Sequence, residues 1–182
     1  RYISTLTLAE LREIEIPGGG IPTLAETLQA FPSARFNLDL KRANAIEPAM
    51  LAIAEAAAFD RVLVSSFSES RRKRALTFAA AEKVATGAGL ARILLAYLAA
   101  RFGTQRMFNR VLGDSHAIQI PYEHRLIKTM HPKFVARVLA SGVRLHYWVV
   151  NDAQTMQELV ALGAHGIVTD RADVAAKVLR EK

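Results

Sequence analysis

Short apolar stretches alternate along this chain with longer stretches in which apolar residues recur every three or four positions. The first pattern is typical of strands and the second of helices. The chain therefore predicts six strands, and a helix follows each of them. The strands are predicted at Phe36–Lys41, Arg61–Phe67, Lys83–Gly87, Ala117–Pro121, Arg144–Val150 and Gly166–Asp170. The helices are predicted at Ile46–Ala58, Glu69–Phe78, Leu90–Arg101, Pro132–Ser141, from a cap at Asp152 to Leu162, and at Ala172–Arg180.

Six strand–helix units in succession favour parallel strands joined by crossover helices, which is the α/β class. A closed TIM (β/α)8 barrel and an open doubly wound sheet both satisfy this pattern. The run Gly18-Gly19-Gly20 follows a helical segment, so it predicts a loop rather than the glycine fingerprint of a dinucleotide site. A barrel of eight strands needs two more, and the stretch before residue 16 offers only a helix at Leu8–Ile14 after a cap at Thr7. We therefore expect either an open sheet or a single domain, residues 1–182, that begins inside a longer barrel.

Composition narrows the classes of partner. The net charge of +7 over 182 residues favours phosphate esters, nucleic acid or an acidic membrane surface. The densest basic run, Arg71-Arg72-Lys73-Arg74, contains no aromatic residue, and we interpret it as a solvated helix face. The apolar run Ile93–Phe102 is too short to span a bilayer, so we predict a core-packed helix there, with contact to a membrane surface as the alternative. The absence of cysteine excludes disulfides, metal–thiolate sites and thiol nucleophiles.

The first predicted strand carries the most suggestive polar pattern. Asn37, Asp39 and Lys41 alternate with leucines, so an acid and a base share one face of the strand. Reactive groups of parallel α/β folds cluster at the carboxyl ends of strands. If this face lines a barrel, Asp39 is a hard oxygen ligand for Mg²⁺ or Ca²⁺, and Lys41 is a point charge for a phosphate oxygen. An exposed strand face with a weak ion pair explains the same pattern equally well.

Three other strand ends carry candidate binding groups. Ser66 could donate its hydroxyl to an anion, whereas Ser68 is interpreted as the cap of the next helix. Gln119 lies inside a short apolar strand and needs a hydrogen-bonding partner. Trp148 offers a ring face for a small polyol, although a tryptophan more often belongs to a core. The five histidines are scattered and form no metal-ligand or hydrolase motif.

Five segments of the chain, taken in order, form a recognisable series. They are IPTLAE at Ile21–Glu26, FNLDLK at Phe36–Lys41, VSSF at Val64–Phe67, WVVND at Trp148–Asp152 and LGAHGIVTDR at Leu162–Arg171. The series resembles the glycerophosphodiester phosphodiesterase family over nearly the whole chain. The resemblance implies a TIM barrel of the phospholipase C-like phosphodiesterase type, with about six of its eight βα units present here. It also implies metal-dependent hydrolysis of glycerophosphodiesters to an alcohol and glycerol 3-phosphate, in lipid and glycerol metabolism.

The same resemblance implies roles for individual residues. Asp39 falls at a metal-ligand position of the family's third strand, where Glu is commoner, and Lys41 at a phosphate-contacting position. Trp148 corresponds to the residue that packs on the glycerol moiety, and Gln119 and Ser66 complete the predicted substrate-binding set. The implied cofactor is Mg²⁺ or Ca²⁺. The family's His-Arg-Gly, its Glu-x-Asp and a following His precede the region where this sequence begins, so we predict no catalytic residue within this chain and little activity from it alone.

Other functional classes stay open at this point. One is a non-catalytic relative that binds phosphodiesters or a protein partner. Another is a different phosphoester lyase or phospholipase on a related barrel, and a nucleic-acid-binding module is a more distant reading. We expect a small-molecule phosphodiester as the partner, no nucleic acid, no stable membrane insertion, and a cytoplasmic rather than a secreted location.

Overall fold

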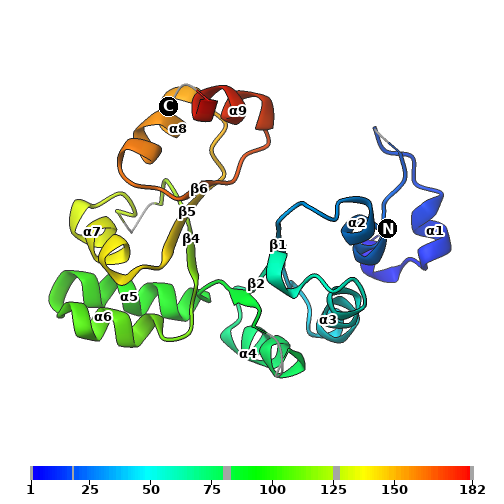
Figure 1. Ribbon diagram of the computed structural model, residues 1–182, viewed down its shortest axis with the longest axis horizontal. Coiled ribbons are helices and arrows are strands. Elements are labelled where there is room, and N and C mark those ends of the chain that lie inside the picture. Colours follow the sequence, from blue (N-terminus) through cyan, green and yellow to red (C-terminus); the bar gives the residue numbers. More distant parts are fainter. Residues whose placement is uncertain (1, 18, 80–82, 125–127, 181–182) are drawn as a thin grey trace.

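The computed structural model describes residues 2–17, 19–79, 83–124 and 128–180. Within these residues, parallel strands form a curved sheet, and the helices that connect them lie on its outer side (Figure 1). This arrangement confirms the predicted α/β class. Gly18 of the glycine run lies outside the described residues, and Gly19 is part of a tight turn in which its N–H donates to the carbonyl of Ile16.

The strands follow one another across the sheet in chain order. β1 (Phe36–Asp39), β2 (Val62–Ser65) and β3 (Ala85–Thr86) form one parallel group, and β4 (Ala117–Pro121), β5 (Arg144–Trp148) and β6 (Gly166–Ile167) form the second. A parallel bridge between Gly87 and Ala117 joins the two groups. The backbone N–H of His116 donates to Thr86 and that of Ala88 donates to Ala117, both at 2.8 Å. The result is one continuous arc from β1 to β6.

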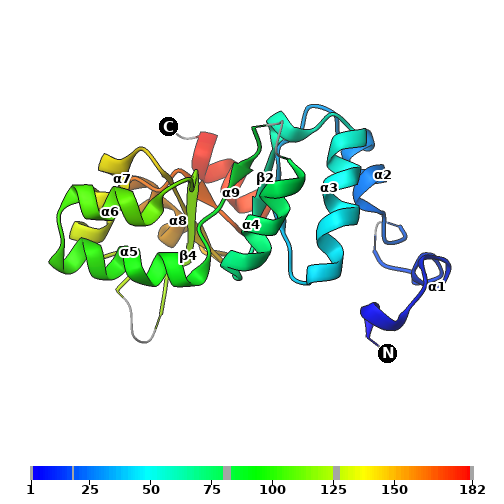
Figure 2. The same ribbon diagram turned by 90° about the horizontal axis from the view of Figure 1, so that it is seen from below.

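The helices surround this arc. Their bounds are α1 Leu8–Arg12, α2 Leu24–Ala30, α3 Ile46–Glu55, α4 Glu69–Phe78, α5 Leu90–Phe102, α6 Gln105–Leu112, α7 Pro132–Ser141, α8 Ala153–Ala161 and α9 Ala172–Arg180. Short 3-10 helices lie at Ile3–Thr5, Ala43–Ala45 and Phe59–Arg61. Figure 2 shows α5, α6 and α7 at one end of the molecule and α1 and α2 at the other. No helix of the described residues is both long enough and apolar enough to cross a bilayer.

The predicted elements are present, but most strands are shorter than the apolar runs that predicted them. β6, for example, has two residues where five were expected. Two helices, α2 and α6, were not predicted. Each begins at a threonine cap, Thr23 for α2 and Thr104 for α6, and Thr23 also exchanges hydrogen bonds with Glu26 in a capping box. This Thr-x-x-Glu spacing is the signal in the sequence that could have located α2.

Two clusters of buried side chains hold the helices on the sheet. One surrounds β1 and β2 and includes Leu28, Ile46 and Val64; the other surrounds β4 and β5 and includes Phe108 and Tyr147. Each cluster therefore fixes one half of the arc, and the junction between β3 and β4 has to keep the halves in register.

The basic run in α4 contributes to this junction, and the interpretation of the whole run as solvated was wrong. The Arg72 side chain is 0% exposed and donates to Glu69 at 2.6 Å and to Asp114 at 3.1 Å. Arg92, from the first turn of α5, contacts the same two carboxylates. Burial by itself raises the pKa of Asp114, but the hydrogen bonds from Arg72 and Arg92 outweigh it and lower that pKa to about 2. The four charges form a network, here called the junction network, that ties α4, α5 and the loop before β4 together.

Replacement of Arg72 by methionine should destabilise the fold, since it leaves the junction network with two carboxylates and one cation. Removal of one partner from a buried ion pair costs about 3–5 kcal/mol, and we expect about 2–3 kcal/mol here because both carboxylates are partly exposed. Urea unfolding of Arg72→Met measures the loss. The matched control Lys73→Met alters the exposed neighbour and should change the free energy of unfolding by less than about 0.5 kcal/mol. Equal midpoints for the two variants would contradict the role given to the network.

Candidate functional site

The carboxyl ends of the strands meet at a pocket of about 330 Å³ on the inner side of the arc. It is lined by Asn37, Asp39, Lys41, Ser65, Ser66, Phe67, Ala88, Leu90, Ile93, Gln119, Trp148, Val149 and Val168. The structure therefore brings together all five residues that the sequence predicted as site residues: Asp39, Lys41, Ser66, Gln119 and Trp148. A larger hollow of about 890 Å³ lies elsewhere, but its lining comes from the single segment that follows β4 rather than from several strand ends.

Side-chain alternation in β1 places its polar residues at this pocket. Leu38 and Leu40 pack into the core, while Asp39 and Lys41 lie on the opposite face. Lys41 Nζ lies 2.9 Å from Asp39 Oδ2, and the two side chains are 79% and 31% exposed respectively. The pair is therefore a solvated ion pair that also lines a pocket, and the roles of Asp39 as a metal ligand and of Lys41 as a phosphate contact stay predictions. An ion pair this exposed contributes little to stability. Asp39 and Lys41 can therefore separate and each bind a ligand at a small cost in free energy.

The hydroxyl of Ser66 is occupied by the protein itself. Ser66 is 3% exposed, donates to the carbonyl of Leu40 at 2.8 Å and accepts from Arg71 Nε at 3.1 Å. Arg71 also donates to the carbonyl of Lys41 at 2.5 Å. Ser66 and Arg71 together fix the backbone that carries Lys41. Substrate contact by Ser66 stays a prediction, and Arg71 is a positioning residue that the sequence analysis assigned to a solvated face.

Gln119 has the partner that a buried amide requires. Its Nε2 lies 3.3 Å from Nδ1 of His146 on the neighbouring strand. Because an amide nitrogen can only donate, Nδ1 of His146 accepts this bond. Burial, together with the positive charges of His165 and Arg144, lowers the pKa of His146, which favours the neutral ring that can accept. Gln119 is thereby held in one orientation at the pocket.

Gly87 lies close to side chains of two other strands at the pocket. A Cβ added at Gly87 would lie 3.1 Å from Cβ of Ser65 and 3.6 Å from Oε1 of Gln119. The first distance is tighter than ordinary van der Waals contact, so a side chain here would require Ser65 of β2 to shift, whereas the second distance is an ordinary contact. The absence of a side chain at this position leaves the space that Ser65 and Gln119 border.

Two aromatic rings form an apolar wall. The rings of Phe67 and Trp148 meet edge to face with centroids 6.3 Å apart. Trp148 is half-buried on the lining rather than inside the core, where a tryptophan is more often found. Sequence reasoning missed Phe67 as a site residue. Its position two residues after the end of β2 was the available signal.

The last motif of the chain stabilises the loops beside the pocket. Asn151 accepts from Thr169 Oγ1 and from the backbone N–H of Asp170, both at 2.9 Å, and donates to the Asp170 carboxylate at 3.1 Å. Asp152 caps α8 by accepting from the N–H of Thr155, which lowers the pKa of Asp152. These residues therefore hold the loops after β5 and β6 together, a structural role that the motif by itself did not reveal.

The charges at the pocket suit an anion attached to a small carbon skeleton. Lys41 offers an ammonium, Gln119 an amide, and Trp148 with Phe67 an apolar wall. Asp39 is the one carboxylate among the described lining residues, and none of those residues is a histidine. Across the part of the chain that the structure describes, no group of three or more His, Cys, Asp or Glu side chains could hold a metal ion.

Comparison with known proteins gives a consistent result. The chain matches the model of the glycerophosphoryl diester phosphodiesterase family over residues 1–174. It is 37% identical over 179 residues to the probable glycerophosphodiester phosphodiesterase 2 of Mycobacterium tuberculosis, a match that covers 97% of this chain and 67% of that protein.

Solved structures share the fold. A glycerophosphodiester phosphodiesterase from Parabacteroides distasonis superposes with a TM-score of 0.70 at 18% identity, over 98% of this chain and 73% of that one. A phosphodiesterase from Oleispira antarctica, solved in complex with the product sn-glycerol-3-phosphate, gives a TM-score of 0.65 at 19% identity, over 98% of this chain and 72% of that one. At these identities the likeness identifies the fold, which is that of the TIM barrel.

The environment of His146 predicts an acid-shifted titration. Because burial and the neighbouring cations lower its pKa, the ring should titrate below the ordinary value of about 6.5 in a pH series of NMR spectra. Below that value the unfolded chain binds more protons than the folded one, so the free energy of unfolding should fall as the pH falls. Arg144→Gln removes one of the cations and should raise the midpoint of His146. A midpoint at or above the ordinary value in the unsubstituted protein would contradict the described environment.

Proposed function

The chain belongs to the glycerophosphoryl diester phosphodiesterase family, and from that premise we propose that its pocket binds a glycerophosphodiester. The domain of which it is part hydrolyses that substrate to an alcohol and glycerol 3-phosphate. One observation carries the proposal beyond family membership. Residues that were chosen from the sequence for phosphate, polyol and cation chemistry come from four different strands or from the residues just after them, and they line one pocket.

In this proposal, different side chains contact different parts of the ligand. Lys41 provides a point charge for a phosphate oxygen. Trp148 and Phe67 cover the carbon atoms of the glycerol moiety, and Gln119 is held by His146 to hydrogen-bond a hydroxyl. The net charge of +7 attracts such an anion at longer range.

The proposed barrel extends beyond the strands described here. β1 and β6 are the two edges of the arc, and neither has a second strand partner among the described residues. We propose that the arc is about six of the eight strands of a closed barrel, whose closure would pair both edges. Closure would also shield the exposed Asp39–Lys41 pair from bulk water.

A divalent cation, Mg²⁺ or Ca²⁺, is part of the proposal, although the described residues do not form a site for it alone. Asp39 supplies one hard oxygen, whereas these ions take six or more oxygen ligands. The remaining ligands would come from water, substrate and residues other than those described. The cation would supply charge stabilisation at the phosphate, and no proton transfer is assigned to it.

Hydrolysis also requires groups that move protons. Water gives up a proton as its oxygen bonds to phosphorus, the bond from phosphorus to the leaving oxygen breaks, and the departing alkoxide takes up a proton. The described lining offers the Asp39 carboxylate and the Lys41 ammonium, which pair with each other at 2.9 Å. The same scarcity of acid–base groups favours the second candidate function, a non-catalytic domain that binds phosphodiesters.

Binding to the pocket can be measured directly because Trp148 is the single tryptophan of the chain. Titration with glycerol 3-phosphate should change the tryptophan emission. Lys41→Met should weaken binding about tenfold, the value expected when one hydrogen bond to a charged group is lost. Lys73→Met removes the same charge from an exposed position on α4 and serves as the matched control. If the two variants bound glycerol 3-phosphate with equal affinity, Lys41 would not be part of the binding site.

Activity distinguishes the two candidate functions. We expect the 182-residue polypeptide alone to release little or no glycerol 3-phosphate from glycerophosphocholine, because the described pocket lacks a proton-transfer pair. A longer product of the same reading frame should release it in a reaction that a chelator abolishes and that Asp39→Asn slows. Chelator-sensitive turnover by the polypeptide alone would contradict the first expectation, and no turnover by the longer product would favour the binding domain.

A further inference from the structure

The outer face of α5 is apolar where a surface helix is normally polar. Ala96, Ala99 and Ala100 bury the inner face in the core. On the outer face lie Leu94 (42% exposed), Leu95 (56%), Leu98 (53%) and Phe102 (77%). Their spacing of three and four residues places them in one continuous stripe, here called the α5 stripe. Isolated exposed leucines are ordinary, but a contiguous stripe of this kind indicates an interaction surface.

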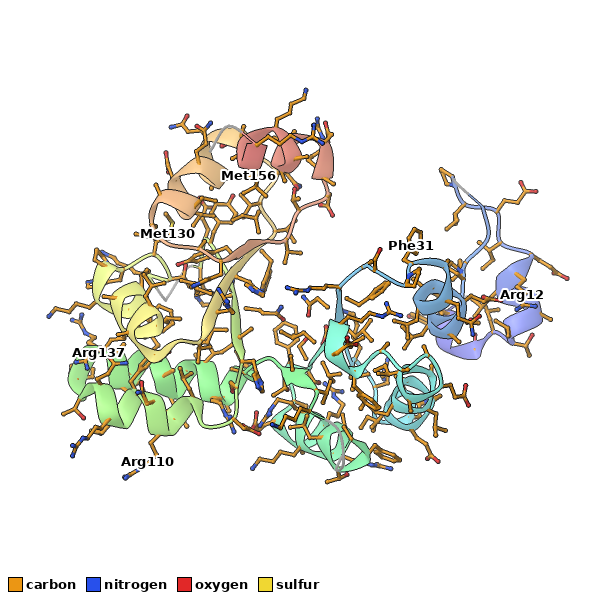
Figure 3. The ribbon with its side chains drawn as sticks, viewed as in Figure 1. Arg12, Phe31, Arg110, Met130, Arg137 and Met156 are labelled. Carbon is orange, nitrogen blue, oxygen red and sulfur yellow. The ribbon has the colours of Figure 1, made fainter. Side chains whose placement is uncertain are left out.

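The three helices at this end of the molecule carry positive charge only. Helices α5, α6 and α7 contain no Asp or Glu. Their basic residues are Arg92, Arg101, Arg106, Arg110, Lys133 and Arg137. Arg92 is engaged in the junction network, and the other five surround the stripe's end of the molecule. Figure 3 shows Arg110 and Arg137 at the outer edge of this end.

Two shallow grooves join the apolar stripe to the cations. Both lie between α5 and α7, with volumes of about 280 and 420 Å³. Arg101 and Lys133 line both grooves, Phe102 lines the first, and Arg137 lines the second. An anionic group in the first groove would lie beside the ring of Phe102 and near the cations Arg101 and Lys133. In the second groove it would lie near these two cations and Arg137. Neither groove shares a residue with the pocket at the strand ends.

We propose that this face, the α5 stripe with the two grooves, binds peripherally to an anionic lipid surface. Apolar side chains enter the boundary between headgroups and acyl chains, while arginines and lysine contact lipid phosphates. None of the described helices is long and apolar enough to cross a bilayer. The proposal adds to the phosphodiesterase function and does not depend on it.

The charge pattern selects lipid over other occupants. A second copy of the chain would set two cationic faces against each other, which costs free energy at an interface. A nucleic acid would satisfy the cations and could stack a base on Phe102, but it would leave Leu94, Leu95 and Leu98 in contact with water. An anionic bilayer is the partner that satisfies both the leucines and the cations.

Sedimentation with vesicles tests the proposal. The 182-residue chain should co-sediment with phosphatidylcholine vesicles that contain phosphatidylglycerol and not with pure phosphatidylcholine vesicles, and added salt should weaken the binding. The double variant Leu94→Ser/Leu98→Ser should lower the partition coefficient about tenfold or more, because two leucines lose their apolar contact. Lys133→Gln should lower it about fivefold, the effect of one cation at an anionic surface.

Matched control variants distinguish binding through this face from nonspecific binding to vesicles. Leu51 lies on α3 between Glu47 and Glu55, and its side chain is 52% exposed, about as much as that of Leu98. Because Leu51 lies outside the proposed face, Leu51→Ser should leave vesicle binding unchanged. Lys73→Gln on α4 is the control for Lys133→Gln. Circular dichroism checks that each variant folds. If the double leucine variant fails to fold, Lys133→Gln still tests the proposal, because Lys133 is exposed.

Several results would overturn the proposal. Absence of binding, equal binding to neutral and anionic vesicles, or equal losses in the control variants would each exclude a lipid surface as the specific partner. Sedimentation velocity that shows a dimer, converted to a monomer by Leu94→Ser/Leu98→Ser, would assign the stripe to a second copy. Retention on DNA that is lost in Lys133→Gln but not in the leucine variant would assign the cations to nucleic acid instead.

Discussion

The contact between β3 and β4 is the constraint on which the arrangement depends. Each half of the arc has its own buried cluster, and few backbone hydrogen bonds link the halves. Arg72 compensates for this because its guanidinium is fully buried and shared between Glu69 and Asp114, which belong to the two sides of the junction. Arg92 binds the same carboxylates and anchors the start of α5. A network of four charges is directional, so it fixes the relative position of the halves more precisely than apolar contact does.

The position of the two halves also determines the shape of the pocket. Asp39 and Lys41 lie on the half formed by β1 and β2, whereas Gln119 and Trp148 lie on the half formed by β4 and β5. Gly87 stands between them, at the bridge that joins the halves, and its missing side chain leaves open the space that Ser65 and Gln119 border. A pocket built from both halves keeps its shape only if the junction keeps its geometry. The junction network thus supports the polar lining of the pocket.

The positive charge of the protein is distributed between two kinds of surface. At the pocket a single exposed ammonium, Lys41, pairs with Asp39 and can release it for an anion. On α5, α6 and α7 cations surround apolar side chains without any carboxylate in the same helices. The first arrangement suits one small phosphate ester, and the second suits an extended surface with many phosphates above an apolar layer. In a family that cleaves glycerophosphodiesters, both ligand types present the same phosphodiester charge.

The sequence by itself determined the order and type of most elements, the α/β class, and the face on which Asp39 and Lys41 lie, because alternation and helix caps are local properties of the chain. It also selected five of the residues that line the pocket. It did not determine that Arg72 is buried, since its partner Asp114 lies 42 residues away, nor that Ser66 is occupied by Leu40 and Arg71. The apolar run of α5 looked like a core helix, yet only one side of it found a core to face. Burial, pairing and exposure depend on which distant segments meet, and only the tertiary structure decides that.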